Sequence, residues 1–228
     1  MPSWPEIWNR RSLPNDGTIL DRLIRADGFD SGAGAMSEAL WLKIHQKLSE
    51  IVQISENDSI FEVGCGAGAF LYPYYCSQHV VGGVDYSEAL IAIARSVMND
   101  MFFEVSDAAS FQLNEFYDVI VANSVFQYFH DMAYAEKVIK KMLLSARKRV
   151  AILDVPDVQM QSISELKRKE AVPVGEYETK YAGLLHTDYE KEWFRNIARE
   201  SGCSVTILDQ ESSSYGNSSF RFNVVLGK

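Results

Sequence analysis

A glycine-rich stretch, SIFEVGCGAGAF at residues 59–70, is the part of the sequence best suited to hold a ligand. Residues that favour β-strands lead into Gly64, Gly66 and Gly68, and glycine lets the backbone approach a bound group closely because it has no side chain. This spacing fits G-x-G-x-G, while Gly64, Gly66 and Ala69 fit the G-x-G-x-x-A variant of the dinucleotide fingerprint equally well. The loop therefore predicts a ligand with a nucleotide part but does not choose among such ligands, and the alternative is a tight turn without a ligand.

Two carboxylates follow later strand-like runs and suit an adenosine. Asp85 ends the second run and stands 21 residues after Gly64 (85 − 64), where a carboxylate accepts hydrogen bonds from both ribose hydroxyls. After the third run, the carboxylate of Asp107 and the backbone N–H of Ala108 suit the adenine amino group and a ring nitrogen. Asp107 is equally well placed to cap the segment after it, and Tyr86 either lies against the adenine or covers the next helix.

Four histidines, His45, His79, His130 and His186, are candidates for a general base near neutral pH. We expect surface or core roles for His45 and His79, which lie in a predicted helix and ahead of a strand, remote from the expected site. His130 follows the fourth strand, and it either acts in catalysis or begins a helix. His186 lies in LLHTDYEKEWF, where it either touches the substrate or is an exposed loop residue.

From Ser59 onward, short apolar runs alternate with helical ones. Strands are predicted at residues 60–63, 80–84, 101–105, 119–122 and 150–153. This alternation predicts an α/β fold with a doubly wound, mostly parallel sheet, and two final runs, CSVTILDQ and SFRFNVVLG, predict a closing antiparallel hairpin. Ligands bind such sheets at the carboxyl ends of the strands, so the glycine loop and the carboxylates should meet there.

The start of the chain differs from the rest. Residues 1–56 are predicted to form a helical cap or lid, and residues 57–228 a ligand-binding domain in which an insertion at 156–190 covers the substrate; together they form one compact unit. Aromatic and apolar residues flank the glycine-rich DGFDSGAGAM and are costly to expose, namely Trp4, Trp8, Phe29 and Met36. Residues 1–36 therefore either order over a bound ligand as a lid or dock permanently at the edge of the sheet.

Bulk properties limit the partners. The 228 residues are 47% hydrophobic and 23% charged, enough to bury a core, and the formal charge of −9 with a pI near 5.0 disfavours nucleic acid. We find no secretion signal and no apolar run of membrane-spanning length, and therefore predict a cytoplasmic protein that does not bind membranes. The three cysteines form no CxxC motif or Cys/His cluster, so no disulfide framework and no metal site are predicted. The oligomeric state is left open.

The motifs together resemble the class I S-adenosylmethionine-dependent methyltransferases, particularly their small-molecule branch (the type 11, 12 and 25 groups). The matching pieces are FEVGCGAG with its acidic Glu62, GVDYSEALIAIAR, SDAASF and YDVIVANSVFQYF, over roughly residues 58–155. The resemblance implies a seven-stranded Rossmann-like sheet. It also implies S-adenosylmethionine as cofactor, with a site that includes Glu62, Gly64, Cys65, Gly66, Asp85, Tyr86, Asp107, Ala108 and Asn123.

The resemblance implies methyl transfer to an O or N nucleophile of a small molecule by in-line displacement. Asn123 would border the transferred methyl group, and the absence of N-P-P-[FY] after it speaks against nucleic-acid and glutamine substrates. Candidate substrate residues are Tyr128, Asn217 and Arg221, although the last two are equally able to complete a turn and a sheet surface. Two alternatives are a nicotinamide-dependent oxidoreductase, disfavoured because the chain lacks a Tyr-x-x-x-Lys pair, and a non-catalytic binding module.

Overall fold

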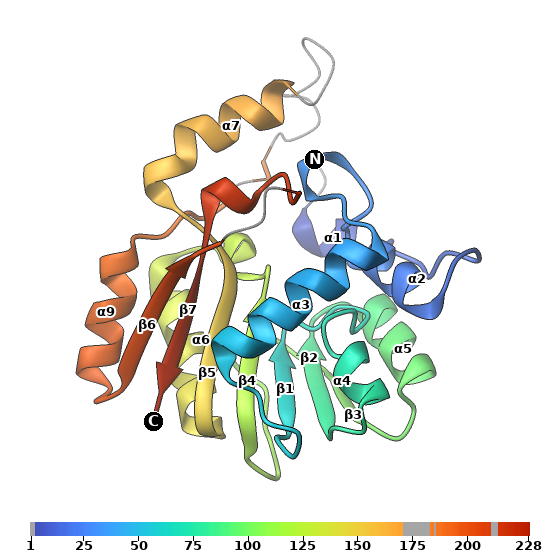
Figure 1. The fold of residues 1–228 in the computed structure, drawn as a ribbon, viewed down its shortest axis with the longest axis horizontal. Helices are drawn as coiled ribbons and strands as arrows, with labels where there is room; N and C mark the ends of the chain where they lie inside the picture. The colour runs from blue at the N-terminus through green and yellow to red at the C-terminus, as the bar shows by residue number, and fades with distance from the viewer. Residues whose placement is uncertain (1–2, 171–182, 185, 211–213) are drawn as a thin grey trace.

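A twisted seven-stranded sheet runs through the molecule (Figure 1), and the computed structural model describes residues 3–170, 183–184, 186–210 and 214–228. Its strand order is β3-β2-β1-β4-β5-β7-β6; β7 runs antiparallel to both of its neighbours, and the remaining pairs are parallel. The strands are β1 (Ile60–Val63), β2 (Val81–Asp85), β3 (Phe102–Val105), β4 (Tyr117–Asn123), β5 (Ala146–Pro156), β6 (Ser204–Asp209) and β7 (Arg221–Gly227). The predicted doubly wound sheet with a terminal antiparallel hairpin is confirmed.

The fifth strand is longer than the apolar run that predicts it. β5 pairs with β4 from Ala146 onward and with β7 from Arg149 onward, so its polar start is held by ladder hydrogen bonds. Lys148 in that start forms ion pairs with Asp58 and Asp118. Pairing with neighbours on both sides therefore extends the strand beyond the predicted residues 150–153.

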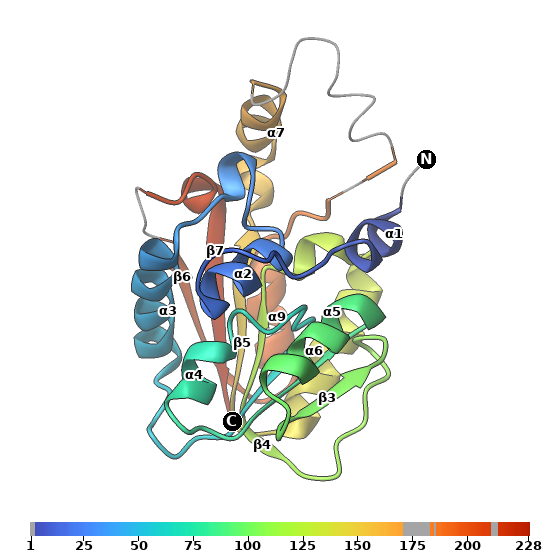
Figure 2. The ribbon, with the colours of Figure 1, turned by 90° about the vertical axis from the view of Figure 1, so that its right-hand side faces the viewer.

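Helices cover both faces of the sheet (Figure 2). One face is packed against α3 (Glu38–Val52), α4 (Tyr72–Cys76) and α5 (Glu88–Val97), and the other against α6 (Met132–Ser145) and α9 (Lys191–Glu200). Neighbouring residues of β1 point to opposite faces, so that Ile60 joins the first core and Phe61 the second, and both are fully buried. The central strand β1 is buried along its whole length because helices cover both faces there, whereas the edge strands β3 and β6 are partly exposed.

The remaining elements gather at the end of the sheet where the parallel strands finish (Figures 1 and 2). They are α1 (Trp4–Asn9), α2 (Ile19–Ala26), η1 (Gly32–Gly34), η2 (Phe126–Tyr128), η3 (Val158–Met160), α7 (Gln161–Glu170) and η4 (Ser218–Phe220). α2 buries Leu23 and Ile24 completely. A side chain at Gly216 would lie 2.6 Å from the carbonyl oxygen of Ala33, so the N-terminal segment lies directly against the turn before β7.

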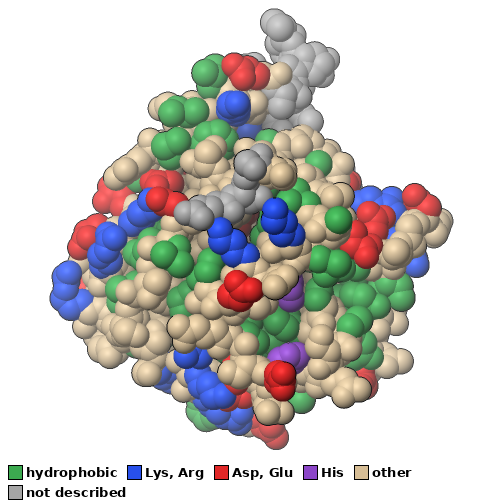
Figure 3. All heavy atoms as spheres, in the orientation of Figure 1, with side chains coloured by type: hydrophobic (Ala, Val, Ile, Leu, Met, Phe, Trp, Pro, Cys, Tyr) green, Lys and Arg blue, Asp and Glu red, His purple; other side chains and the backbone are tan. Residues whose placement is uncertain are grey.

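The surface of the molecule carries charged side chains of both signs (Figure 3). None of the helices in the described ranges is long and apolar enough to cross a membrane. On the face shown in Figure 3, acidic and basic side chains are interspersed. The three cysteines are free, and the described residues contain no group of three or more His, Cys, Asp or Glu side chains that suits a metal ion.

Candidate functional site

The glycine loop lies between the ends of β1 and β2, as predicted. The backbone N–H groups of Gly64 and Cys65 both donate to the carbonyl oxygen of Val84, at 2.7 and 3.0 Å. Gly64 has a φ of 75°, and a side chain there would lie 2.4 Å from a methyl group of Val125, so only glycine fits. Cys65 is buried, with its Sγ 3.7 Å from the carbonyl oxygen of Gly66. The sharp turn places the loop backbone at the carboxyl edge of the sheet.

Asp85 ties this loop to the end of β2. Its Oδ2 accepts from the N–H of Gly66 at 3.0 Å, and its Oδ1 accepts from the N–H of Ser87 at 2.8 Å. Ser87 in turn caps α5 by accepting from the N–H of Leu90 at 3.2 Å. The carboxylate that the sequence singles out is therefore fixed at the mouth of the glycine loop.

Asp27, at the end of α2, is a site residue that the sequence analysis missed. Its two carboxylate oxygens accept from the N–H groups of Ala67 and Ala69, at 2.6 and 3.0 Å. A side chain at Gly66 would lie 2.3 Å from Oδ1 of Asp27, and the φ of Gly66 is 52°. The N-terminal segment thus reaches the glycine loop through one carboxylate, forty residues away in sequence and without a motif to mark the contact.

Asp27, Glu62 and Asp85 form a cluster that we call the acidic cluster. Glu62 is 2% exposed, and its Oε2 has no hydrogen-bond partner in the described part of the chain. Burial raises the pKa of Asp27 to about 7, with a further contribution from Asp85. Burial, and then Asp27 and Asp85, raise the pKa of Glu62 well above its usual value, and burial raises that of Asp85. Such a cluster favours a positively charged ligand.

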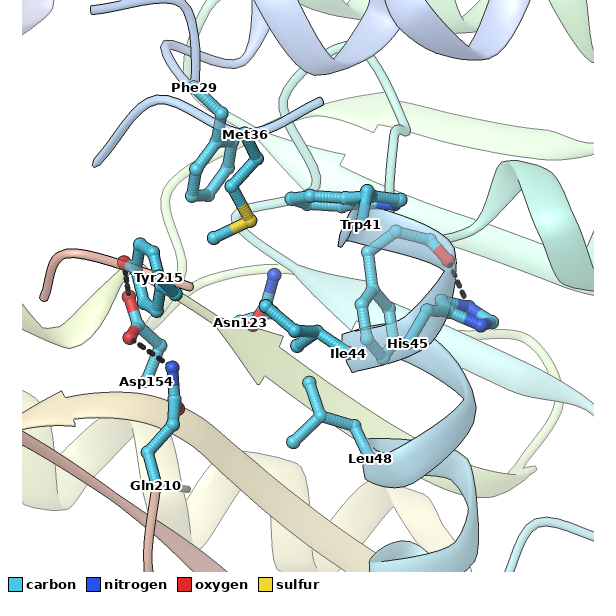
Figure 4. Close-up of a pocket in the computed structure, with 11 residues that line it drawn as sticks. Phe29, Met36, Trp41, Ile44, His45, Leu48, Asn123, Asp154, Gln210 and Tyr215 are labelled. Carbon is cyan, nitrogen blue, oxygen red and sulfur yellow. Dashed lines mark hydrogen bonds between the residues drawn. The ribbon is translucent and has the colours of Figure 1, made fainter. Parts of the chain in front are cut away.

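A narrow pocket opens beside the glycine loop at the end of β4 (Figure 4). Its lining residues are Phe29, Met36, Trp41, Ile44, His45, Leu48, Phe70, Asn123, Asp154, Gln210 and Tyr215. The predicted residue Asn123 lies between the apolar side chains of α3 and the polar group of Asp154, Gln210 and Tyr215. Phe29 and Met36 of the N-terminal segment form part of its wall, so that segment contributes to the site.

His45 forms part of this pocket, contrary to the expectation that it lies remote from the site. Its Nε2 lies 3.1 Å from the carbonyl oxygen of Phe70, and burial lowers its pKa to about 4. The imidazole is therefore neutral near pH 7. The expected core role remains consistent with this buried hydrogen bond.

Asp154, near the end of β5, and Ser124, directly after β4, have a left-handed backbone conformation that is uncommon outside glycine. Their φ angles are 57° and 58°. Asp154 is 4% exposed; its Oδ2 accepts from Ser124 Oγ at 2.5 Å and from Tyr215 Oη at 3.0 Å, and its Oδ1 accepts from Gln210 Nε2 at 3.1 Å. Sequence reasoning missed Asp154, although its position directly after a predicted strand is the signal that identified Asp85.

Tyr128 and His186, both predicted site residues, lie together in a cluster that we call the aromatic group. Trp4 stacks on His186 with ring centroids 5.0 Å apart, and Tyr128 lies 4.7 Å from Trp4, 5.5 Å from Trp8 and 5.7 Å from His186. Thr187 fixes the histidine there, since its N–H donates to Gln127 and its hydroxyl to Phe129. Burial, and then the nearby Arg168 and Arg221, lower the pKa of His186 to about 3.

The structure places other predicted residues at or near solvent. Tyr86 is 40% exposed next to Asp85. Asp107 is exposed, and it accepts from the hydroxyl of Tyr134 at 2.7 Å. It also accepts from the N–H of Ala109 at 2.8 Å, which fits the alternative that Asp107 caps the segment after it. The partly exposed Ala108 lies between these groups.

His130 and Asn217 are not central to the pocket. His130 is exposed, with Nε2 3.4 Å from a carboxylate oxygen of Asp131, and it does not line the pocket. Asn217 does not line the pocket itself, but its amide donates to the hydroxyl of the lining residue Tyr215 at 3.4 Å. Arg221, by contrast, donates from Nη1 to the carbonyl oxygen of Asp154 at 3.4 Å, beside the pocket.

Comparison with known proteins gives a family and several relatives. A family model described as "Methyltransferase domain" matches residues 54–201. Malonyl-[acyl-carrier protein] O-methyltransferase from Bacillus anthracis is 35% identical over 85 residues, which span 34% of this chain and 31% of the relative. Trans-aconitate 2-methyltransferase from Escherichia coli O1:K1 / APEC is 28% identical over 167 residues, which span 68% of this chain and 60% of the relative.

Solved structures share the fold. The crystal structure of magnesium protoporphyrin IX methyltransferase from Synechocystis PCC 6803 with bound SAH has a TM-score of 0.59 and 17% sequence identity. The match covers 92% of this chain and 96% of that protein. At this identity the likeness bears on the fold alone.

Proposed function

The chain belongs to the methyltransferase domain family, and from this premise we propose that it transfers a methyl group from S-adenosylmethionine to an O or N atom of a small molecule. The relatives support the proposal, because their names describe the methylation of malonyl-[acyl-carrier protein] and of trans-aconitate. The chain matches only part of their length, so their acceptors are not assigned to it.

The acidic cluster is the observation that carries the proposal. S-adenosylmethionine has positive sulfonium and α-ammonium groups and one negative α-carboxylate, so it brings a net positive charge to a loop whose neighbours are Asp27, Glu62 and Asp85. The unpartnered Oε2 of Glu62 is an acceptor that an ammonium group would satisfy, and none of the three carboxylates has an ion pair within the described ranges. A reduced nicotinamide dinucleotide brings two negatively charged phosphates instead, which the same carboxylates would repel.

Each part of the site has a proposed role in binding. Asp85 holds the ribose, with Asp107 and Ala108 at the adenine and Tyr86 beside it. Gly64 and Gly66 allow the methionyl part to approach the backbone, with Cys65 behind them.

When bound, S-adenosylmethionine supplies a methyl group already activated by the sulfonium, so the residues around it mainly orient the acceptor and exclude water. Asn123 borders the methyl group at the end of β4. Phe29 and Met36 are part of the pocket wall beside Asn123, which supports a covering role for residues 1–36. The aromatic group, which includes His186 and Tyr128, is the proposed substrate side of the site, together with Arg221.

The domain organisation and partners remain proposals of the same kind. Residues 1–56 form the cap and residues 57–228 the catalytic domain, with 156–190 over the substrate. Part of that insertion, residues 171–182 and 185, falls outside the described residues. We propose a cytoplasmic enzyme that acts on a small molecule rather than on nucleic acid or at a membrane.

Isothermal titration with S-adenosylhomocysteine and with NADH tests the proposal, followed by an assay of labelled methyl transfer over a metabolite panel. We expect the first ligand to bind and the second not to bind. Binding of NADH alone would identify an oxidoreductase. Binding of S-adenosylhomocysteine without transfer to any member of the panel would favour the non-catalytic module.

A further inference from the structure

Two guanidinium groups approach the aromatic group from neighbouring elements. Arg168 lies on α7, which packs against η4, and Arg221 directly follows η4 at the start of β7. Both side chains are partly buried. The positive charges of both arginines also lower the pKa of His186. The arginines therefore border the same side of the site.

Both arginines retain donors for a ligand. Arg168 donates to Ser164 Oγ at 3.2 Å, and Arg221 donates to the carbonyl oxygen of Asp154 at 3.4 Å. Neither forms an ion pair with a carboxylate in the part of the chain that the structure describes. Since a guanidinium group has five N–H donors, each arginine has capacity left to bind an anion.

Three carboxylates lie in this region, Asp154, Asp157 and Asp188, and none of them forms an ion pair with either arginine in the described ranges. Both oxygens of Asp154 already accept from Ser124, Gln210 and Tyr215. Asp157 is paired with Lys191 instead, and burial raises the pKa of Asp188 while Arg168 and Arg221 lower it. Both guanidinium groups are therefore without an ion-paired carboxylate in the described part of the chain.

We propose that the methyl acceptor is a carboxylate, bound by Arg168 and Arg221 beside His186 and Tyr128, and that its own oxygen takes the methyl group to give a methyl ester. Arg221 connects this anion site to the transfer site, because its hydrogen bond to Asp154 places it at the end of β5, and Asp154 lines the same pocket as Asn123. This inference rests on the proposed methyl transfer and narrows its acceptor.

The reaction needs no base. One carboxylate oxygen supplies the electron pair for the new oxygen–carbon bond, the methyl–sulfur bond breaks with its pair going to sulfur, and no proton moves. The products are a methyl ester and S-adenosylhomocysteine. An alcohol acceptor would have to lose a proton, and His186, with its pKa lowered to about 3, is a weak base for that task.

The test uses the full chain and S-adenosylmethionine with a labelled methyl group. The acceptor panel contains aliphatic mono- and dicarboxylic acids of increasing length and aromatic carboxylic acids, each paired with its primary amide. Products are treated with mild base, which releases labelled methanol from methyl esters but leaves methyl ethers and methylamines intact. We expect base-labile label from acids and none from their amides.

Arg168→Gln and Arg221→Gln test the two binding residues, because glutamine removes the charge and keeps much of the side-chain length. Each should raise KM for the acid by at least about tenfold, while kcat changes by less than about threefold and S-adenosylhomocysteine binds unchanged. Arg221→Lys should recover part of the loss. Arg199→Gln, which changes an exposed side chain on α9, is the matched control and should behave as the wild type.

Three results would overturn the inference while the proposed function stands: label only in base-stable form, no transfer to any acid although S-adenosylhomocysteine binds, or an unchanged KM in both arginine variants. Absence of S-adenosylhomocysteine binding in the wild type would instead remove the proposed function, and with it this inference. The titration is therefore run on every variant beside the transfer assay.

Discussion

The two halves of the site differ in the charged side chains that lack an ion pair within the described ranges. In the acidic half, at the ends of β1 and β2, Asp27, Glu62 and Asp85 lie together without an ion pair in the described ranges. In the basic half, Arg168 on α7 and Arg221 at the start of β7 have no ion-paired carboxylate in those same ranges. Like charges held together in a partly buried place oppose folding, so each half gains stability from a ligand of opposite charge.

This separation of charge fits the proposed reaction. A sulfonium cofactor suits the acidic half and a carboxylate acceptor suits the basic half. Transfer of the methyl group removes both the sulfonium charge and the carboxylate charge, so the ester has lost its charge and S-adenosylhomocysteine keeps only its ammonium group as a positive charge. We therefore expect both products to bind less tightly through these charges than the substrates do.

Gly66→Val should have the largest effect on the acidic half. The new side chain would meet Asp27, because even a Cβ there lies 2.3 Å from Oδ1, and it would also fill space beside the loop. We expect no measurable S-adenosylhomocysteine binding by titration, with the fold retained by circular dichroism. Gly202→Val is the matched control: Gly202 also has a positive φ, but nothing lies within 4 Å of a Cβ there. Normal binding by Gly66→Val would mean that the loop is misassigned.

Asp85→Ala should weaken S-adenosylhomocysteine binding by at least about tenfold, consistent with the loss of charge-assisted hydrogen bonds worth about 1.5–3 kcal/mol. The measurement is the titrated Kd. Asp209→Ala, which removes an exposed carboxylate on β6, should leave the Kd unchanged. If Asp85→Ala also leaves the Kd unchanged, Asp85 does not hold the ribose.

The pH dependence of cofactor binding tests whether the charge of the acidic cluster attracts the cofactor. With a pKa of about 7, Asp27 takes up a proton as the pH falls through 7, and a protonated carboxyl no longer attracts a cation. Affinity for S-adenosylmethionine should therefore fall by roughly tenfold from pH 8 to pH 6. The other groups that act on Asp27 are Asp85, Arg11, Glu62 and the N–H groups of Ala67 and Ala69.

Asp27→Asn isolates the contribution of Asp27 to this profile. Asparagine has no proton to take up in this range, so the titrated affinity should change much less between pH 8 and pH 6. A profile as steep as that of the wild type would assign the pH dependence to another group. In the free protein the raised pKa also has a stability consequence: stability from this group is full below about pH 4 and is lost as the pH rises through 7.

Limited proteolysis should show the smallest effect, on the N-terminal segment. If residues 1–36 act as a lid, cleavage within DGFDSGAGAM should be several-fold slower with S-adenosylhomocysteine bound, because Asp27 connects that segment to the glycine loop. A cleavage site elsewhere in the chain serves as the internal control. Equal rates with and without ligand would favour the permanently docked helices.

The sequence predicts the sheet and the local half of the site, because those signals are local. The apolar runs, the Gly64–Gly68 turn and Asp85 at the end of a strand each depend on a few neighbouring residues, and the structure has them where they were predicted. Asp27 could not be predicted in the same way, since its partners are forty residues distant and no pattern pairs them.

The basic half shows the same limit. The sequence marks Arg221 as a candidate substrate residue near the terminal hairpin. Its proposed role in binding an anion depends on Arg168 and His186, which lie on separate segments that only packing brings together. The bulge of β5 that turns Asp154 into the pocket also depends on pairing with β7. Asp154 itself could have been predicted, because it directly follows a predicted strand, as Asp85 ends one.

A crystal structure with S-adenosylhomocysteine tests the central claim most directly, because it measures which groups the acidic half binds. The account predicts both ribose hydroxyls within hydrogen-bond distance of the Asp85 carboxylate, and the amino group of the ligand facing Glu62 and Asp27. A ligand bound away from the glycine loop, or one whose amino group faces Arg168 and Arg221, would contradict it.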